Sequence, residues 1–360
     1  MRVSIILRYV GTVMLCVSAF MLVSAGISYM NNVDSGFYPL LLSSMLTLTL
    51  GAFPLLFVPR AQSISNKEGF TIVVGSWVLA SVVGMFPYLI WGGEFTMINA
   101  WFESVSGFTT TGASILNDIE ALPRGLQFWR MSTSWIGGIG VVMFALVILP
   151  SIGKSKMMLS HFELSSLAKD NFNLYRTPTV VRIVLSVYIG LTIVTTLLLK
   201  LCGMTWFDSV CHAMSACGTC GFGTKNTSIA WFDSAWVEVV LMSAMCTSGI
   251  HFGLIFATLT RQRNNIFRSE ITRTYFSVIG LSALFITVSL WAADIYPTLF
   301  ESFRKALFHT VSLITTTGFA TADCNTWTTF AIMILMFCSF VCACAAAKQA
   351  ATAIVKINFF

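Results

Sequence analysis

The sequence is poor in charge. Only 10% of its 360 residues are Asp, Glu, Lys or Arg, whereas 56% are hydrophobic. An average soluble domain carries roughly 25% charged residues, so this chain lacks the polar surface that a packed core in water would need. The composition therefore excludes an ordinary soluble protein, and the usual estimate of domain number from chain length does not apply.

Most of the hydrophobic residues lie in long runs. A helix needs about 20 apolar residues to cross a hydrocarbon core of about 30 Å. Short alternating segments of the kind that build a transmembrane barrel are lacking, so we predict an all-α polytopic membrane protein. The first run is too long for a typical signal-peptide core, and we expect it to be a retained helix. The predicted spans are 3–25, 37–58, 70–91, 128–150, 179–202, 235–259, 274–293 and 328–347.

The charges that are present alternate in sign between successive loops. Lys and Arg gather near 60–69, 151–178 and 260–273, and the loops between them are mostly acidic. Because basic loops stay in the cytoplasm, we expect a cytoplasmic N-terminus. An acidic outer side would concentrate cations. The net charge of +6 either sets topology alone or also binds lipid headgroups, and it gives no reason to invoke nucleic acid.

Candidate metal, redox and catalytic residues are scarce. The ten cysteines lie mostly within or beside apolar runs, and we interpret them as small buried side chains. Glu238 is the main acid that could lie within a span, near its outer end and without an obvious partner, so an enzyme is not expected. The glycines of IGGIG (136–140) lack the neighbouring strand of a phosphate loop and predict close helix packing. No organic cofactor is expected.

A repeat runs through the outer side of the chain. Segments 101–113 (WFESVSGFTTTGA), 210–222 (VCHAMSACGTCGF) and 307–319 (LFHTVSLITTTGF) align without gaps. Each follows an outward-going span and contains a stretch of about ten semi-apolar residues, too short to cross a membrane. Each then ends in a Thr- and Gly-rich tetrad before an inward-going span. This pattern predicts a unit of helix, short pore helix, loop and helix, and interrupted segments of this kind mark substrate sites.

The tetrads fit a pathway for a monovalent cation. Backbone carbonyls and hydroxyls can replace the water shell of such an ion, and no carboxylate cage for Ca²⁺ accompanies them. Glycine allows positive φ and close backbone approach. One tetrad alone would suggest a polar turn, but three in the same topological position favour a filter for a monovalent cation. The predicted filter residues are Thr109, Thr110, Thr111, Gly112, Gly218, Thr219, Cys220, Gly221, Thr315, Thr316, Thr317 and Gly318.

Four polar residues of the predicted pore helices invite other interpretations. Glu103 and Asp208 are expected to cap helix starts, where acids suit the helix dipole, and attraction of cations comes second. His212 and His309 are expected to pack with a hydrogen bond to a neighbouring loop rather than to bind a metal.

Several motifs resemble one known family. They are SNKEGF (65–70), WFESVSGFTTTGA (101–113), QFWRMSTSWIGGIGVVMFALVILP (127–150), GFGTKNTSIAWFDS (221–234) and SGIHFGLIFATLTRQ (248–262). Together they resemble the Trk/Ktr/HKT superfamily of potassium transporters, and within it the Trk-type uptake subunits. The resemblance implies four helix–pore loop–helix repeats around a pseudo-fourfold pore, preceded by an extra helix pair.

The resemblance also implies a domain order. An extra transmembrane helix pair would occupy 1–60, the first repeat 61–150, a cytoplasmic linker with the second repeat 151–260, and a truncated third repeat 261–360. A fourth repeat is absent from this order. The implied function is K⁺ uptake through a carbonyl-lined selectivity filter, and the alternative is a nonconducting fragment of such a transporter.

The resemblance further implies a gate and partners. The family places a Gly- and Ser-rich break under the filter, whereas Ala dominates 340–360 here and favours continuous helix by about 1 kcal/mol per residue over Gly. Ala343, Ala345 and Lys348 are the expected gate region, with Lys348 either near the pore axis or reaching the cytoplasmic side. The implied partners are a second copy of the chain and a cytoplasmic nucleotide-binding regulatory ring of the TrkA type, facing the basic loops.

Overall fold

All regular structure that the computed structural model describes is helical. The described residues are 2–59, 65–148, 177–250 and 269–340, with Ile255, Thr258 and Ile266. They fall into two compact units, Met1–Ile152 and Gly153–Phe360. The all-α prediction is confirmed.

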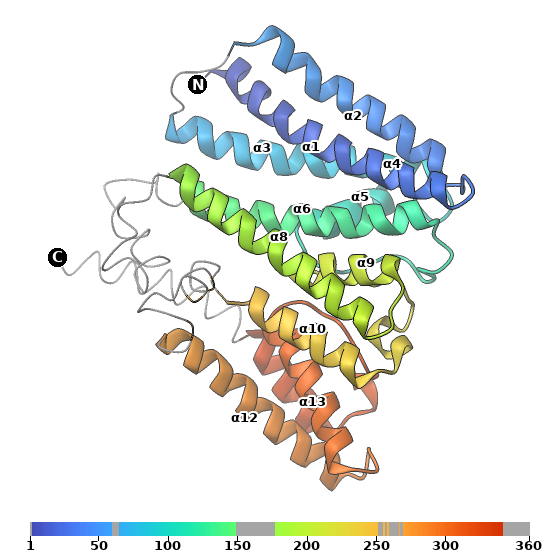
Figure 1. Cartoon of the computed structure of the whole chain (residues 1–360), viewed down its shortest axis with the longest axis vertical. Coiled ribbons are helices and arrows are strands. Elements are labelled where there is room, and N and C mark those ends of the chain that lie inside the picture. Colours follow the sequence, from blue (N-terminus) through green and yellow to red (C-terminus); the bar gives the residue numbers. More distant parts are fainter. Residues whose placement is uncertain are drawn as a thin grey trace, which may run out of the picture. The chain divides into compact units, whose positions relative to one another are not determined.

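The first unit contains six helices within its described residues (Figure 1). The central helix α1 packs against α2, α3 and α6, and the side chains of Val17 and Met21 on it are fully buried. The helices are α1 (Val3–Met30), α2 (Phe37–Phe57), α3 (Asn66–Gly84), α4 (Phe86–Trp91), α5 (Met97–Phe108) and α6 (Arg124–Ile148).

Small residues bring α1 and α2 close together. A Cβ atom on Gly11 would lie 2.6 Å from the carbonyl oxygen of Gly51, and one on Gly51 would lie 2.9 Å from that of Gly11. The hydroxyl of Ser18 also donates to the carbonyl of Ser44 at 2.9 Å. Small residues at a crossing allow such contacts between helices in lipid, where burial of apolar surface contributes little to association.

The second unit is built around two short helices and the longer helices beside them. Helix α9 packs against α8 and α10, and α13 packs against α12 and α10. The described elements are α8 (Thr177–Leu201), α9 (Trp206–Cys217), η4 (Ser228–Phe232), α10 (Ala235–Ser248), α12 (Glu270–Ala292), α13 (Leu299–Ile314), η5 (Cys324–Thr326) and a helix at Thr329–Phe340.

Within the described residues, every predicted span falls on helical structure. Five helices of the described part are long and apolar enough to cross a membrane, and they match the predicted runs that begin at 3, 37, 70, 179 and 274. The run at 128–150 falls on α6. The runs at 235–259 and 328–347 fall on shorter apolar helices, Ala235–Ser248 and Thr329–Phe340, within the described residues.

Candidate functional site: three tetrads at helix ends

Three short helices end at the tetrads, as the repeat predicted. Helices α5, α9 and α13 have 12, 12 and 16 residues, too few to cross a bilayer. Each begins at a threonine whose hydroxyl accepts the backbone N–H three residues later; the threonines are Thr96, Thr205 and Thr298. We call the segments that follow tetrad one (109–112), tetrad two (218–221) and tetrad three (315–318).

The backbone leaves each helix by the same route. The second and third residues of each tetrad donate their N–H groups back to the last turn of the helix, which is the hydrogen-bond pattern of a Schellman motif. The bonds join Thr110 to Gly107 and Thr111 to Ser106, Thr219 to Ala216 and Cys220 to Ser215, and Thr316 to Leu313 and Thr317 to Ser312, at 2.8–3.2 Å. Ser106, Ser215 and Ser312 occupy the same position of the three aligned segments, so a serine supplies one carbonyl acceptor in every copy.

Positive φ angles recur at two places in each tetrad. The second residue is a threonine with φ of 53°, 51° and 58° at Thr110, Thr219 and Thr316. The last residue is a glycine with φ of 76°, 85° and 85° at Gly112, Gly221 and Gly318. Positive φ is strained for a β-branched side chain, and strain of this kind gathers at functional sites. The positive φ of the glycines was predicted, whereas the positive φ of the three threonines, which were predicted as filter residues, was not.

Several carbonyl groups of tetrads one and three are available as ligands. Within the described part of the chain, no hydrogen bond reaches the carbonyl oxygens of 110–112 or 316–318. Within tetrads one and three, the hydroxyls of the first and third residues also form a hydrogen bond with each other. The pairs are Thr109 with Thr111 and Thr315 with Thr317, each at 2.8 Å. Unpaired carbonyls on a fixed ribbon are suited to coordinating a dehydrated cation.

Tetrads two and three lie against each other within the second unit. The backbone at Thr317 packs directly on Gly221. Just beyond the tetrads, the N–H groups of Ile229 and Ala230 donate to the carbonyl of Ala320 at 3.1 and 3.3 Å. The N–H of Ala320 donates in return to the hydroxyl of Ser228 at 3.3 Å. Residues that are almost a hundred positions apart in the sequence thereby meet at one place.

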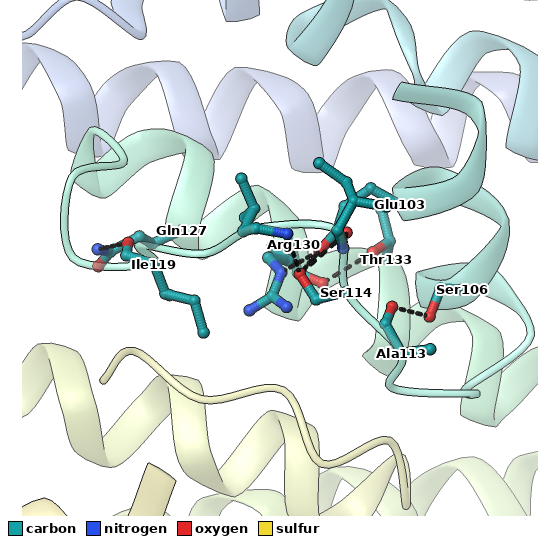
Figure 2. A network of polar contacts seen from close by, with 10 residues as sticks. Glu103, Ser106, Ala113, Ser114, Ile119, Gln127, Arg130 and Thr133 are labelled. Carbon is teal, nitrogen blue, oxygen red and sulfur yellow. Dashed lines mark hydrogen bonds and ion pairs between the residues drawn. The ribbon is translucent and has the colours of Figure 1, made fainter. Parts of the chain in front are cut away.

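Glu103 does not cap its helix, contrary to expectation. It lies in the second half of α5, and its carboxylate accepts from Arg130 Nε, from Ser114 Oγ and from the N–H of Ile115 (Figure 2). The side chains of Glu103 and Arg130 are 0% and 1% exposed. A carboxylate so deeply buried needs a cationic partner. Arg130 lies inside the predicted apolar span 128–150, so the sequence pattern did not indicate it as a partner.

Asp208 lies in the first turn of α9, where an acid was expected, but the capping residue is Thr205. Its carboxylate accepts from the hydroxyl of Thr205 at 2.7 Å, while its N–H donates to that hydroxyl at 3.1 Å. The hydroxyl of Thr224 also donates to it at 2.7 Å. Asp208 therefore joins the start of α9 to the segment that follows tetrad two.

Glu238, for which no partner was expected, forms two ion pairs. Its oxygens accept from Arg304 at 2.6 and 3.0 Å and from Lys305 at 3.0 Å. Because Glu238 is on α10 and the two cations are on α13, the pairs join these two helices. The partners lie 66 and 67 residues away in the sequence, so local spacing could not indicate them.

The two pore-helix histidines differ. His309 accepts the N–H of Thr321 at its Nε2 atom, which is the expected bond to a neighbouring loop. His212 instead places Nδ1 2.8 Å from the carbonyl of Asp208 in its own helix, so the expectation is wrong for this residue. Among the described residues, no three His, Cys, Asp or Glu side chains gather as a metal site.

The predicted close-packing role of the IGGIG glycines is confirmed for Gly137 and Gly140. A Cβ atom on Gly137 would lie 2.3 Å from the carbonyl oxygen of Phe108, at the end of α5, and one on Gly140 would lie 2.9 Å from Trp77 Nε1. Helix α6 therefore contacts the end of the first short helix directly. The expected gate residues Ala343, Ala345 and Lys348 lie outside the described residues.

Comparisons with known proteins agree on one family. The family model TrkH, described as "Cation transport protein", matches residues 40–293. The Trk system potassium uptake protein TrkH of Halomonas elongata is 31% identical over 319 residues, which make up 87% of this chain and 66% of that protein. TrkH of Salmonella typhimurium is 31% identical over 82% of this chain and 61% of its own length.

A solved structure is also similar. The crystal structure of the potassium transporter TrkH from Vibrio parahaemolyticus matches with a TM-score of 0.83 and 28% identity, over 94% of this chain and 70% of that one. The chain spans a little under two thirds of the length of the two curated relatives above.

Proposed function

This chain belongs to the TrkH family of cation transport proteins, and we propose that it takes part in potassium uptake across a bacterial cytoplasmic membrane. The relatives are named as potassium uptake proteins, which are transport proteins rather than enzymes. K⁺ is then the substrate. The membrane potential drives its inward movement, because moving one charge releases about 2.3 kcal/mol per 100 mV.

We propose that the tetrads form the selectivity filter. The observation that carries this proposal is the threefold recurrence of a positive-φ threonine followed by a positive-φ glycine, each time directly after a short helix. The helix ends support it, since the C-terminus of a helix carries partial negative charge that favours a cation. The carbonyls of each tetrad would replace part of the hydration shell of K⁺.

The surroundings of the filter are proposed on the same basis. The domain order given by the resemblance, a homodimer, a cytoplasmic regulatory ring of the TrkA type and a cytoplasmic N-terminus remain proposals. The basic loops support the orientation, and the gate region is proposed at Ala343, Ala345 and Lys348.

Growth at limiting K⁺ tests the proposed function. The chain, and a version extended by a fourth repeat from a relative, are expressed in bacteria that lack their own K⁺ uptake systems. We expect restored growth and K⁺ uptake from at least one of them, and loss of both with Gly112→Ala. If neither protein restores uptake although both reach the membrane, the proposed function is wrong.

A further inference from the structure

In the alignment of segments 101–113, 210–222 and 307–319, Glu103, His212 and His309 occupy one column, three positions before the serine that all three segments share. Two members of the column, a carboxylate and an imidazole, each accept a backbone N–H from the equivalent position of the following segment. Glu103 Oε2 accepts the N–H of Ile115 at 3.2 Å, and His309 Nε2 accepts the N–H of Thr321 at 3.3 Å. In both cases the donor lies 12 residues further along the chain. Each contact therefore attaches the segment that leaves a tetrad to the short helix that precedes it.

The shared serine makes a second contact of the same kind. Ser106 Oγ donates to the carbonyl of Ala113 at 2.6 Å, and Ser312 Oγ donates to that of Phe319 at 2.7 Å, in both cases 7 residues further on. Together with the Schellman bonds, these contacts hold tetrads one and three at both ends. Only the carbonyls between the two ends stay unbonded in the described part of the chain.

The two acceptors are stabilised in different ways. Glu103 carries a charge that Arg130 balances. His309 must be neutral at Nε2 to accept an N–H group, so its Nδ1 carries the proton and faces Cys324 Sγ at 3.0 Å. Both side chains are buried, so water does not compete for either bond.

The second repeat lacks both contacts. His212 Nδ1 donates to the carbonyl of Asp208, which leaves Nε2 as a buried acceptor. Neither this atom nor Ser215 Oγ has a hydrogen-bond partner among the described residues. The segment after tetrad two is held instead by Asp208, through Thr224, and by the backbone bonds to Ala320.

We propose that Glu103 and His309 are positioning residues for the filter, and that His212 has no such role although it occupies the same column. Each of the two holds the far end of its tetrad against the short helix, and thereby fixes how far apart the carbonyl ligands stand. Selection of K⁺ over Na⁺ depends on those carbonyls. This inference rests on the proposed function.

The two histidines provide a matched test. His309→Leu removes an acceptor that is in use, and His212→Leu makes the same substitution at a buried acceptor without a partner. Uptake of K⁺ and of Na⁺ is measured for each variant in the cells described above, or in proteoliposomes. We expect His309→Leu to lower the K⁺/Na⁺ preference by roughly tenfold, as the loss of one hydrogen bond would. His309→Gln, whose amide oxygen can replace Nε2, should retain most of the preference, and His212→Leu should leave it unchanged.

For Glu103 the test uses a pair of changes. Glu103→Gln keeps an acceptor for Ile115 but leaves Arg130 without its counter-charge, so the double variant Glu103→Gln, Arg130→Gln is the informative one. It should keep the ion preference, whereas Glu103→Leu, Arg130→Gln should lose it.

Amide hydrogen exchange provides a readout that needs no transport. In His309→Leu the amide of Thr321 should exchange faster, while in His212→Leu the amide of Thr224 should exchange as in the wild type. Equal effects of the two leucine variants on ion preference and exchange, or no effect of His309→Leu on either, would overturn the proposal. If neither the chain nor its extended version moves K⁺, the proposed function is wrong instead, and the exchange measurement still decides the positioning role.

Discussion

The carbonyl oxygen of Thr317 lies 2.0 Å from the position that a Cβ atom on Gly221 would take. Gly221 ends tetrad two and Thr317 belongs to tetrad three, so the two proposed filter segments touch through their backbones. The φ of 85° at Gly221 adds a second requirement for glycine. Gly318 has the same φ but has nothing within 4 Å of its Cβ position. Comparing the two glycines therefore separates the effect of close backbone contact, which only Gly221 has, from the effect of positive φ, which both have.

Substituting these glycines should have graded effects. Gly318→Ala should cost about 1–2 kcal/mol from the left-handed backbone alone. Gly221→Ala should cost more, because the tetrads must also move apart, and should abolish K⁺ uptake. Gly190→Ala is the control, since that glycine is helical and has open space around it. Thermal unfolding of the detergent-purified proteins gives the order of their stabilities, and equal stability of all three variants would contradict the prediction.

Removing Arg130 should destabilise the first unit more than removing the whole ion pair does. Arg130→Met leaves the Glu103 carboxylate buried without a counter-charge, at a cost of about 3–5 kcal/mol. Adding Glu103→Gln to that variant should recover part of the loss, because no buried charge then remains. Unfolding temperatures of the single and double variants give the comparison. A double variant less stable than Arg130→Met would show that the pair does not act as a unit.

At the ion pairs of Glu238, substituting the acid should lower the stability of the protein more than substituting either base. Glu238 is 3% exposed and faces both Arg304 and Lys305, so Glu238→Gln leaves two cations close together. Arg304→Gln and Lys305→Gln each leave one pair intact. We expect a loss of about 3 kcal/mol for the first variant and less for the other two, since both bases are partly exposed. The same unfolding measurement applies, and a larger loss for Lys305→Gln than for Glu238→Gln would refute this ranking.

Thiol labelling tests the predicted orientation. In a variant whose other cysteines are replaced by alanine, a membrane-impermeant maleimide should reach Cys324 from outside the cell. Burial is the main cause that raises the pKa of the Cys324 thiol to about 11, and the negative charge of Asp323 adds to it. Labelling should therefore be slow at neutral pH and should accelerate about tenfold per pH unit below that pKa, because only the thiolate reacts.

A second cysteine serves as the control for that experiment. The side chain of Asp233 is 93% exposed, and a cysteine at this position (Asp233→Cys) should label quickly at neutral pH from the same side. Labelling of either position only after the cells are permeabilised would reverse the predicted orientation.

The amino-acid sequence alone was sufficient to predict the helical membrane fold and the place of the tetrads. Lipid offers no hydrogen bonds to the backbone, so runs of apolar residues must become helices whatever surrounds them. The glycine that ends each tetrad was predictable for a similar local reason, since its φ angle is open to few other residues. These features depend on the chain and its solvent, and therefore appear in the sequence pattern.

The pairings of the buried charges were decided by tertiary structure. Arg130 reaches Glu103 from a predicted apolar span, and Arg304 reaches Glu238 across 66 residues, so no periodicity could indicate either pair. The same holds for His212 and His309, which share a column and yet bond differently. A buried polar group takes the partner that packing brings within about 3 Å, and that distance exists only once the helices have come together.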